Sequence, residues 1–516
     1  PGKVFDGQYY VAYQVLRDKI NSRFYWDANE RVLLYTLPDG NVSVSENSSE
    51  YTALNETKSE DYVILKTDAY IALPFIQEYT NMEYSVEQEP NRAIITSKWG
   101  EIETAEVKKD TQVRYLGGVK SPILTEVKKS DKVTVLEDED DWMKVATADG
   151  YVGYIKTKSL KNQKKEKTSR DFTEPVYSDM TEDHSINMAW HNVTNAAANN
   201  AVQQVLASTS GLTTIAPTWF SLADTEGNIS SIADADYVNY AHTAGLEVWA
   251  VFRDFHGGTN SYDETYETLR YTSKRAKLED QVVAAAVAAG VDGINLDFEL
   301  ISSKCGVHYV QLVRELSVKC HQNNLVFSVD NYVPQSYNSH YDLKEQGIVA
   351  DYVVIMAYDE HTEGSYEAGS VASISYLQDG IEKTLKKVSA DKVIAGIPFF
   401  TRLWFETAKS PEQLSEEAGT EAASYPNKVS SKALGMEEAA QSVVNAGATA
   451  QWDEKTQQNY AKWSADGGTY RIWLEDAQSL EAKLKVIQGN KLAGVAEWSL
   501  GREESSVWKL ISQYVN

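Results

Sequence analysis

The sequence predicts a multi-domain chain that ends in an α/β barrel of eight parallel strands. Three observations support this fold class. Apolar runs suited to strands alternate with helical patterns from about residue 173 to residue 516, as they do in parallel α/β proteins. One of these runs carries polar side chains at every second position toward its end, where such barrels place their active sites. At 516 residues, the chain also has room for two smaller domains before the barrel.

The first region, residues 1–100, contains an internal repeat, because segment 9–36 recurs as segment 69–97. Each copy is predicted to form a short strand, a helix and a hairpin, which together make a small α+β repeat domain. The repeat resembles the copper-amine-oxidase N-terminal-like module. The region has no histidine, so we expect no copper site and predict a structural or wall-docking role.

The second region, residues 103–161, is rich in short strands separated by turns. Asp149-Gly150 lies between alternating apolar residues, which is a strong hairpin signal. Together with Trp142, this stretch resembles the end of a bacterial SH3-like β-barrel. Such modules either bind cell-wall peptides or space domains, and the sequence favours neither role. Residues 162–172 are charged and poor in apolar side chains, so we predict a solvated linker there.

Eight candidate strands follow in the third region, residues 173–516, and eight is the number that a closed barrel requires. They cover residues 186–190, 213–220, 246–252, 293–299, 325–333, 351–359, 392–400 and 492–500. Residues 280–289 are predicted to form a helix that ends at Gly290. A long insert, residues 403–491, separates the last two strands. We expect it to contain two strands around Gly467-Gly468, with an aromatic face used mainly for packing, and then a helix.

The most informative stretch is 292–299, Asp-Gly-Ile-Asn-Leu-Asp-Phe-Glu. Successive side chains of a strand point to opposite faces, so Asn295, Asp297 and Glu299 share one face. Burying such a row is unfavourable unless the groups are hydrogen-bonded or carry out chemistry. An exposed antiparallel strand with one wet face is the alternative. The helix and glycine that come before favour a barrel strand with carboxylates at its C-terminal end.

Two carboxyl groups at positions i and i+2 perturb each other, so one can keep a proton near neutral pH while the other is ionised. A general acid needs such a raised proton affinity. We assign the acid to Glu299, which lies furthest toward the C-terminal end of the predicted strand.

This octapeptide resembles the DGxxxDxE signature of glycoside hydrolase family 18, the chitinase-like TIM barrels. Chitinases usually have Asp where this chain has Asn295, and the Asn form resembles the bacterial subgroup of spore-cortex and cell-wall N-acetylglucosaminidases. The resemblance implies retaining, substrate-assisted cleavage, in which the acetamido oxygen of the sugar attacks its own C1. Glu299 would protonate the leaving oxygen and later deprotonate water. Asp297 would orient the acetamido N–H, and Tyr358 would hold its carbonyl.

Residues at the C-terminal ends of the other strands are expected to line the site. Many are aromatic and would stack on sugar rings, although aromatic residues also simply favour strands and buried positions. The set consists of Trp190, Trp219, Asp330 or Asn331, Met356, Tyr358, Asp359, Arg402 and Trp498. Asn295 of the fourth strand is expected to bind substrate together with them.

Five of these residues also lie in three segments that resemble strand motifs of the family. Met356 to Asp359 resemble the sixth-strand MxYD, and Trp498 resembles the eighth-strand Trp beneath the sugar. Residues 397–402 resemble the seventh-strand GxPxYxR, with Phe400 in place of Tyr.

Composition narrows the remaining possibilities. A formal net charge of −26 argues against nucleic acid or an anionic membrane as the main partner, and no apolar run reaches the roughly 18 residues of a membrane span. We find no His/Cys cluster with ligand spacing and no phosphate-binding loop, so we expect neither a metal nor a cofactor. Cys305 and Cys320 bracket a predicted helix, which would hold them about 22 Å apart, too far for a disulfide.

The predicted function is hydrolysis of β-1,4 linkages in an N-acetylglucosamine-containing polysaccharide, with peptidoglycan as first choice and chitin-like oligosaccharide as second. A catalytically silent, lectin-like barrel is an alternative, but the intact Glu299 favours the enzyme. A cell-wall scaffold whose barrel is incidental is another. We expect an extracellular or cell-wall-associated location, with docking through the N-terminal domains. Because the sequence begins Pro-Gly-Lys, we expect a leader or anchor outside it.

Overall fold

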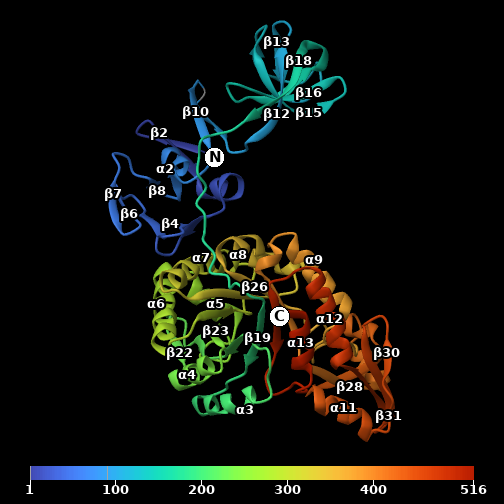
Figure 1. The fold of residues 1–516 in the computed structure, drawn as a ribbon. Helices are drawn as coiled ribbons and strands as arrows, with labels where there is room; N and C mark the ends of the chain where they lie inside the picture. Colours follow the sequence, from blue (N-terminus) through green and yellow to red (C-terminus); the bar gives the residue numbers. More distant parts are fainter. Residues whose placement is uncertain (1, 90, 516) are drawn as a thin grey trace. The chain divides into compact units, whose positions relative to one another are not determined.

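The computed structural model describes residues 2–89 and 91–515. They form two compact units, one built mainly from the residues before Tyr177 and the other from Tyr177 onward. In Figure 1 the first unit is coloured blue to teal and the second green to red.

Both copies of the predicted repeat fold as strand, helix and hairpin. The first copy consists of β2 (Gln8–Ala12), α1 (Tyr13–Val15) with a π-helical turn (Leu16–Ile20), β3 (Phe24–Asp27) and β4 (Val32–Leu37). The second consists of β9 (Tyr70–Ala72), α2 (Leu73–Glu78), β10 (Glu83–Gln88) and β11 (Asn91–Thr96). The other strands are β1 (Gly2–Phe5), β5 (Gly40–Ser45), β6 (Glu50–Ala53), β7 (Glu56–Ser59) and β8 (Leu65–Lys66). Strands β2 and β9 pair antiparallel with Val11 opposite Ile71, so the two copies meet at equivalent positions.

Residues 100–168 form a seven-stranded antiparallel sheet. Its spatial order is β14 (Ile123–Val127), β13 (Thr111–Arg114), β17 (Val152–Lys156), β16 (Trp142–Thr147), β15 (Lys132–Glu139), β12 (Gly100–Val107) and β18 (Leu160–Thr168). The predicted turn joins β16 to β17, with Gly150 at φ 86°. The prediction of a linker at 162–172 is wrong over residues 162–168, which pair with β12. Lysines of β18 face glutamates of β12 there, as in the Lys165–Glu101 ion pair at 2.7 Å, and such cross-strand pairs stabilise a polar strand.

The second unit is a closed barrel of eight parallel strands with helices around it (Figure 1). The ring consists of β19 (Ile186–His191), β20 (Thr214–Pro217), β23 (Glu247–Arg253), β24 (Gly293–Asp297), β25 (Val326–Tyr332), β26 (Tyr352–Met356), β27 (Val393–Pro398) and β33 (Gly494–Trp498). Strand β33 pairs with β19 and closes the ring. Two short strands, β21 (Phe220–Leu222) and β22 (Ile229–Ser231), extend the sheet beside β23. The predicted α/β barrel is therefore confirmed.

The helices of this unit include α3 (Val202–Leu206), α4 (Ala235–Thr243), α5 (Tyr262–Leu269), α6 (Thr272–Ala289), α7 (Gly306–Gln322), α8 (Leu343–Val349), α9 (Ile374–Leu385), α12 (Ala477–Gly489) and α13 (Val507–Val515). Helix α6 contains the predicted helix and ends at Gly290, whose φ of 78° is the left-handed conformation that favours glycine. Cys305 and Cys320, at the two ends of α7, are buried and free. Among the described helices, none has both the length and the apolar character needed to cross a bilayer.

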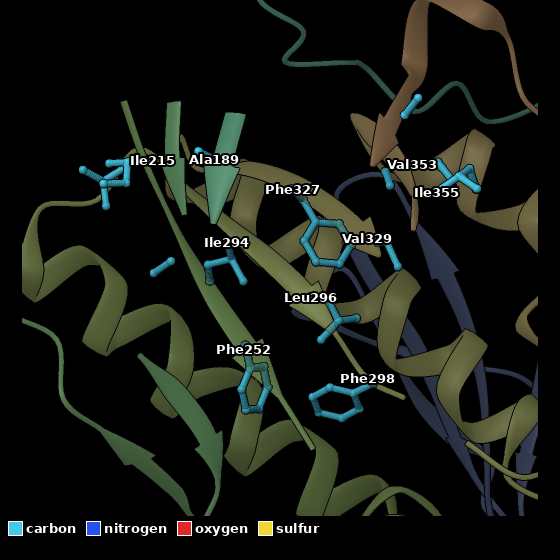
Figure 2. Packing of buried hydrophobic residues seen from close by; sticks show 14 of the residues in the cluster. Ala189, Ile215, Phe252, Ile294, Leu296, Phe298, Phe327, Val329, Val353 and Ile355 are labelled. Atoms are coloured by element: carbon cyan, nitrogen blue, oxygen red, sulfur yellow. The ribbon is translucent and has the colours of Figure 1, made fainter. Parts of the chain in front are cut away.

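Alternation along the barrel strands builds two cores. One parity faces the surrounding helices: Figure 2 shows Ile294 and Leu296 of β24 packed with Phe252 of β23 and Phe327 of β25. The other parity fills the barrel interior, with side chains such as Trp249. Burying each large apolar side chain contributes about 1.5–3 kcal/mol. Toward the C-terminal ends of the strands, polar groups take over the inward positions.

The insert after β27 forms a five-stranded antiparallel sheet of its own. Its spatial order is β29 (Asn427–Gly435), β28 (Phe400–Ala408), β32 (Gly468–Leu474), β31 (Gln458–Ala465) and β30 (Gln451–Asp453), and it carries helices α10 (Pro411–Glu416) and α11 (Met436–Asn445). The predicted hairpin at Gly467-Gly468 is present and is followed by α12. Asp476 caps α12 by accepting a hydrogen bond from the Ser479 N–H at 3.0 Å. Trp463 and Tyr470 stack across the hairpin at 5.4 Å, which agrees with a packing role for the aromatic face.

Candidate active site

A cavity of about 160 Å³ opens at the C-terminal ends of the barrel strands, the end at which this fold carries its chemistry. Six of the eight ring strands, or the loops that follow them, contribute to its wall. The lining residues are Trp190, Arg253, Phe255, Asp297, Glu299, Asp330, Tyr332, Met356, Tyr358, Asp359 and Trp498. Seven of the residues predicted for the site therefore meet in one cavity: Trp190, Asp297, Glu299, Met356, Tyr358, Asp359 and Trp498.

Glu299 lies two residues beyond the end of β24, in a loop that is fixed by hydrogen bonds. The backbone N–H groups of Glu299 and Leu300 donate to the buried carboxylate of Asp254 at 2.9 and 3.0 Å. The Tyr332 hydroxyl donates to the Glu299 carboxylate. Burial raises the pKa of Glu299, the bond from Tyr332 opposes this rise, and the charge of Asp359 adds to it. The net upward shift favours the protonated form that a general acid needs.

Asp297 is buried on the inward face of β24. Burial raises its pKa well above the ordinary value, and the neighbouring Glu299, Asp330 and Asp254 carboxyls raise it further against the opposing charge of Arg253. Its Oδ1 is buried and has no hydrogen-bond partner among the described residues. A buried oxygen without a partner is unfavourable, so Asp297 retains the capacity to bind a polar group of a ligand.

Asn295 lies beneath the cavity and is fully buried. Its Oδ1 accepts a hydrogen bond from the Trp190 indole N–H at 3.0 Å, and its Nδ2 donates to Ser328 at 2.9 Å and to Asp330 at 2.7 Å. Burial raises the pKa of Asp330 to about 8, although the bond from Asn295 lowers it. The amide therefore positions Trp190 and Asp330. The prediction that Asn295 itself binds substrate does not match this placement, because its side chain is used within the protein.

An aromatic floor lies on the other side of the cavity. The ring centroids of Trp190 and Trp498 are 6.0 Å apart, and those of Trp190 and Tyr358 are 6.4 Å apart. Phe400 packs edge-on against Tyr358 at 6.2 Å. Trp498 is the more exposed of the two indoles, and it presents an apolar surface of the kind that sugar rings stack on.

Residues 255–503 match the family described as glycosyl hydrolases family 18. The barrel is a family 18 domain. Residues 109–161 match the bacterial SH3 domain. The family resemblance, the glycosidase class and the SH3-like module predicted from the sequence are therefore confirmed.

Three proteins similar to the family 18 domain come from Bacillus species. An uncharacterized glycosylase of Bacillus subtilis, YvbX, is 26% identical over 295 residues, which are 55% of this chain and 80% of that protein. The cortical fragment-lytic enzyme of the same species is 27% identical over 256 residues, 48% of this chain and 54% of that protein, so the match spans about half of its length. The spore cortex-lytic enzyme SleL of Bacillus megaterium has a similar fold, with a TM-score of 0.53 and 19% identity over 68% of this chain and 78% of that one.

Two residues predicted to bind substrate face away from the cavity of the family 18 domain. Trp219 is buried in the outer core, where its indole N–H donates to Asn199 at 2.8 Å. Strand β20 ends at Pro217, so Trp219 lies beyond the strand end at which it was expected. Asn331 points outward and exchanges hydrogen bonds with Gln346 at 2.7 and 3.0 Å. Both predictions are wrong, and of the alternatives Asp330 and Asn331 it is Asp330 that lines the site.

Arg402 belongs to the sheet of the insert and does not line the cavity of the family 18 domain. Its guanidinium donates to the Ser431 hydroxyl at 2.9 Å. Arg402 still affects the site electrostatically. Burial raises the pKa of Asp359, and the positive charge of Arg402 partly offsets this rise.

Four residues in or next to the cavity were missed: Arg253, Asp254, Phe255 and Tyr332. For two of them the signal was the same alternation that identified Asp297. Arg253 has the parity of the inward residues Trp249 and Val251 on β23, and Tyr332 has the parity of Asp330 on β25. Asp254 and Phe255 lie in the loop beyond β23, where alternation carries no information.

Proposed function

We propose that the family 18 domain is a retaining, substrate-assisted glycosidase that cleaves β-1,4 linkages beside N-acetylglucosamine. Peptidoglycan is its first candidate substrate and chitin-like oligosaccharide its second. One observation carries the proposal: the Glu299 carboxyl, with a raised pKa, lies beside Asp297 in a cavity with an aromatic floor. A relative named for lysis of cortical fragments favours a cell-wall glycan.

Glu299 serves as the general acid and then as the general base. Its carboxyl lines the cavity, and burial raises its pKa. It donates that proton to the glycosidic oxygen as the bond to C1 breaks, and the resulting carboxylate later takes a proton from the attacking water. The hydrogen bond from Tyr332 stabilises this carboxylate between the two steps.

The nucleophile comes from the substrate itself. Asp297 and Glu299 come from one strand and the loop that follows it, whereas two-carboxylate mechanisms need groups on both sides of the scissile bond. The acetamido oxygen attacks C1 from within the sugar and forms an oxazolinium ion. The unpartnered oxygen of Asp297 binds the acetamido N–H, and the hydroxyl of Tyr358 binds its carbonyl oxygen.

Product analysis tests this mechanism. Wild-type protein is expected to release reducing ends from N-acetylglucosamine oligomers and from purified peptidoglycan, with the β-anomer formed first by NMR. Glucose oligomers, which lack the acetamido group, are expected to be stable. Glu299→Gln should slow hydrolysis by about 10²–10⁴-fold. An α-anomer, or cleavage of glucose oligomers, would overturn the mechanism, and binding without any release by wild type would favour the lectin-like barrel.

The residues before the barrel are proposed to dock the enzyme to the bacterial cell wall. Supporting this, residues 109–161 match a bacterial SH3 domain. We propose domains at 1–100, 103–161 and 173–516, and an extracellular or wall-associated location that brings the cavity to its polymer.

A further inference from the structure

Arg253 is a buried cation that forms no ion pair among the described residues. It ends β23 on the inward face and lines the cavity, with only 9% of its surface exposed. Its Nε is buried and donates no hydrogen bond to any group within residues 2–89 and 91–515. The guanidinium lies 5.6 Å from the ring centroid of Phe255, a cation–π contact that uses none of its N–H groups.

Other buried arginines of the barrel are neutralised by carboxylates. Arg275 donates through Nε to Glu315 at 2.9 Å, and Arg314 donates through Nε to Glu345 at 2.7 Å. Leaving a buried charge uncompensated costs several kcal/mol. Arg253 differs from these two residues because its partner is not part of the protein.

Asp297 is the acid best placed to be an internal partner, yet it leaves Arg253 uncompensated. Their charges attract, but among the described residues the two side chains form neither a hydrogen bond nor an ion pair. Burial raises the pKa of Asp297 and raises that of Asp330 to about 8. With a pKa of about 8, Asp330 keeps its proton at neutral pH, so the cavity is less negative than its four acids imply, and Arg253 is the cation that lines it.

We propose that Arg253 binds a carboxylate carried by the glycan, so that the enzyme selects an acid-bearing N-acetylated sugar chain over a neutral one. A guanidinium binds a carboxylate through two parallel N–H···O bonds. Polymers of N-acetylglucosamine alone have no such group, whereas peptidoglycan does. The inference rests on the proposed function and separates its two candidate substrates.

Peptidoglycan offers this carboxylate from two sources. One is the lactyl ether on the muramic acid ring, which is ionised only when its peptide is absent, and the other is the peptide itself. The small cavity of about 160 Å³ favours the lactyl group, because it is attached directly to a sugar. Hydrolysis of the amide bond between lactyl group and peptide would then have to come before cleavage by this enzyme.

Arg253→Met and Arg253→Lys test the assignment on four glycans: neutral N-acetylglucosamine oligomers, peptide-free peptidoglycan strands, the same strands with methyl-esterified carboxyls, and intact peptidoglycan. The kcat/KM ratio of peptide-free strands to neutral oligomers is expected to fall about 10- to 100-fold in Arg253→Met. The ratio for Arg253→Lys should lie between those of wild type and Arg253→Met, because lysine keeps the charge but cannot form two parallel hydrogen bonds to a carboxylate. Esterification should abolish the wild-type preference and leave Arg253→Met unaffected.

The Kd values for peptide-free strands and for neutral oligomers are also compared in the Glu299→Gln background. The preference for the acidic glycan can then be measured even if the protein hydrolyses neither glycan and the proposed function is wrong. A lactyl source predicts preference for peptide-free over intact strands, and a peptide source predicts the reverse. Arg502→Met is the matched control, since Arg502 also lies over a phenylalanine ring, 5.8 Å from Phe400, but does not line the cavity. Equal losses of Arg253→Met on neutral and acidic glycans, or a preference that survives esterification, would overturn the assignment.

Discussion

At the scale of single residues, the Tyr332 hydroxyl adjusts the acid. Its hydrogen bond to Glu299 holds the pKa of Glu299 below the value that burial alone would give. Tyr332→Phe should therefore raise that pKa and move the alkaline limb of the kcat/KM profile up by about one pH unit. Rates between pH 4 and pH 9 measure the shift. Tyr337→Phe, at a side chain 78% exposed, should leave the profile unchanged, and a shift to lower pH in Tyr332→Phe would contradict this role.

Asp330 links the site to the pH dependence of stability. Its pKa is about 8 in the folded protein against an ordinary 3.8, so between these values the folded state holds a proton that the unfolded chain has lost. The stabilising contribution is complete below about pH 4 and is lost as pH rises through 8. Asp330→Asn keeps a neutral acceptor for Asn295, so its Tm should fall less than that of wild type between pH 5 and pH 8. Thermal denaturation across this range is the test, and a steeper fall in the variant would refute it.

Alternation along a strand predicted some residues of the site but not the contacts between them. Alternation placed Asp297 correctly because one continuous strand carries it. The expectation that residues at strand ends line the site failed for Trp219, because β20 ends at Pro217, before that residue. The partners that shift the pKa of Glu299, Tyr332 and Asp359, come from other strands, and a single sequence does not show which strand ends converge on one carboxyl.

At the scale of elements, the loop after β24 depends on Asp254. Its carboxylate accepts the N–H groups of Glu299 and Leu300 and the hydroxyl of Thr265. Asp254→Ala leaves two partly buried N–H groups unpaired, at a cost of up to about 1–3 kcal/mol each, and releases Glu299 from its position. We expect a lower Tm and a kcat reduced by about 100-fold with little change in KM. Thr265→Val removes only the hydrogen bond from the hydroxyl group, so it should lower Tm and kcat far less. Equal losses of kcat in the two variants would contradict a positioning role for Asp254.

The seam between the first and last barrel strands depends on Gly494. A Cβ there would lie 2.0 Å from the backbone oxygen of Ile186 on β19. Gly494→Ala should therefore force the strands apart and destabilise the barrel by about 1–3 kcal/mol or more, as measured by denaturant unfolding. Gly489 in α12 has no atom within 4 Å of such a Cβ, so Gly489→Ala should be neutral or stabilise by up to about 1 kcal/mol. Equal changes in the free energy of unfolding for Gly494→Ala and Gly489→Ala would show that the close approach of Gly494 to Ile186 does not require a glycine.

Elements were predicted best where burial decides the pattern. Each predicted barrel run overlaps a ring strand, because strands covered on both faces read as apolar. The end of the fourth strand was placed at Glu299, whereas β24 stops at Asp297 and Asp254 holds the continuation as a loop. Strand β18 was read as a linker because ion pairs rather than apolar burial stabilise much of its length, and charge alone does not distinguish a solvated spacer from a paired strand.

At the scale of the whole molecule, each unit has cores of its own, two in the residues before Tyr177 and others in the barrel and its insert. The barrel is therefore expected to fold without the first unit.

The formal charge of −26 repels an anionic wall, so docking has to overcome this repulsion. Wall binding by the full chain should strengthen as salt rises from about 0.01 M to 0.15 M, because the Debye length shortens from about 30 to 8 Å. Weaker binding at the higher salt would indicate that attraction between opposite charges dominates.

The proposed function assigns wall docking to the first unit and cleavage of the glycan to the barrel. If the first unit holds the enzyme on the wall, residues 177–516 alone should cleave soluble oligomers as fast as the full chain. On insoluble peptidoglycan the loss of a tethered contact should lower the rate by about 100-fold at limiting enzyme. Full-length Glu299→Gln, which keeps the first unit, should sediment with the wall without releasing reducing ends. Equal rates of the two chains on insoluble wall would mean that the SH3 domain is a spacer, and slower cleavage of soluble oligomers by residues 177–516 would mean that the first unit supports the cavity itself.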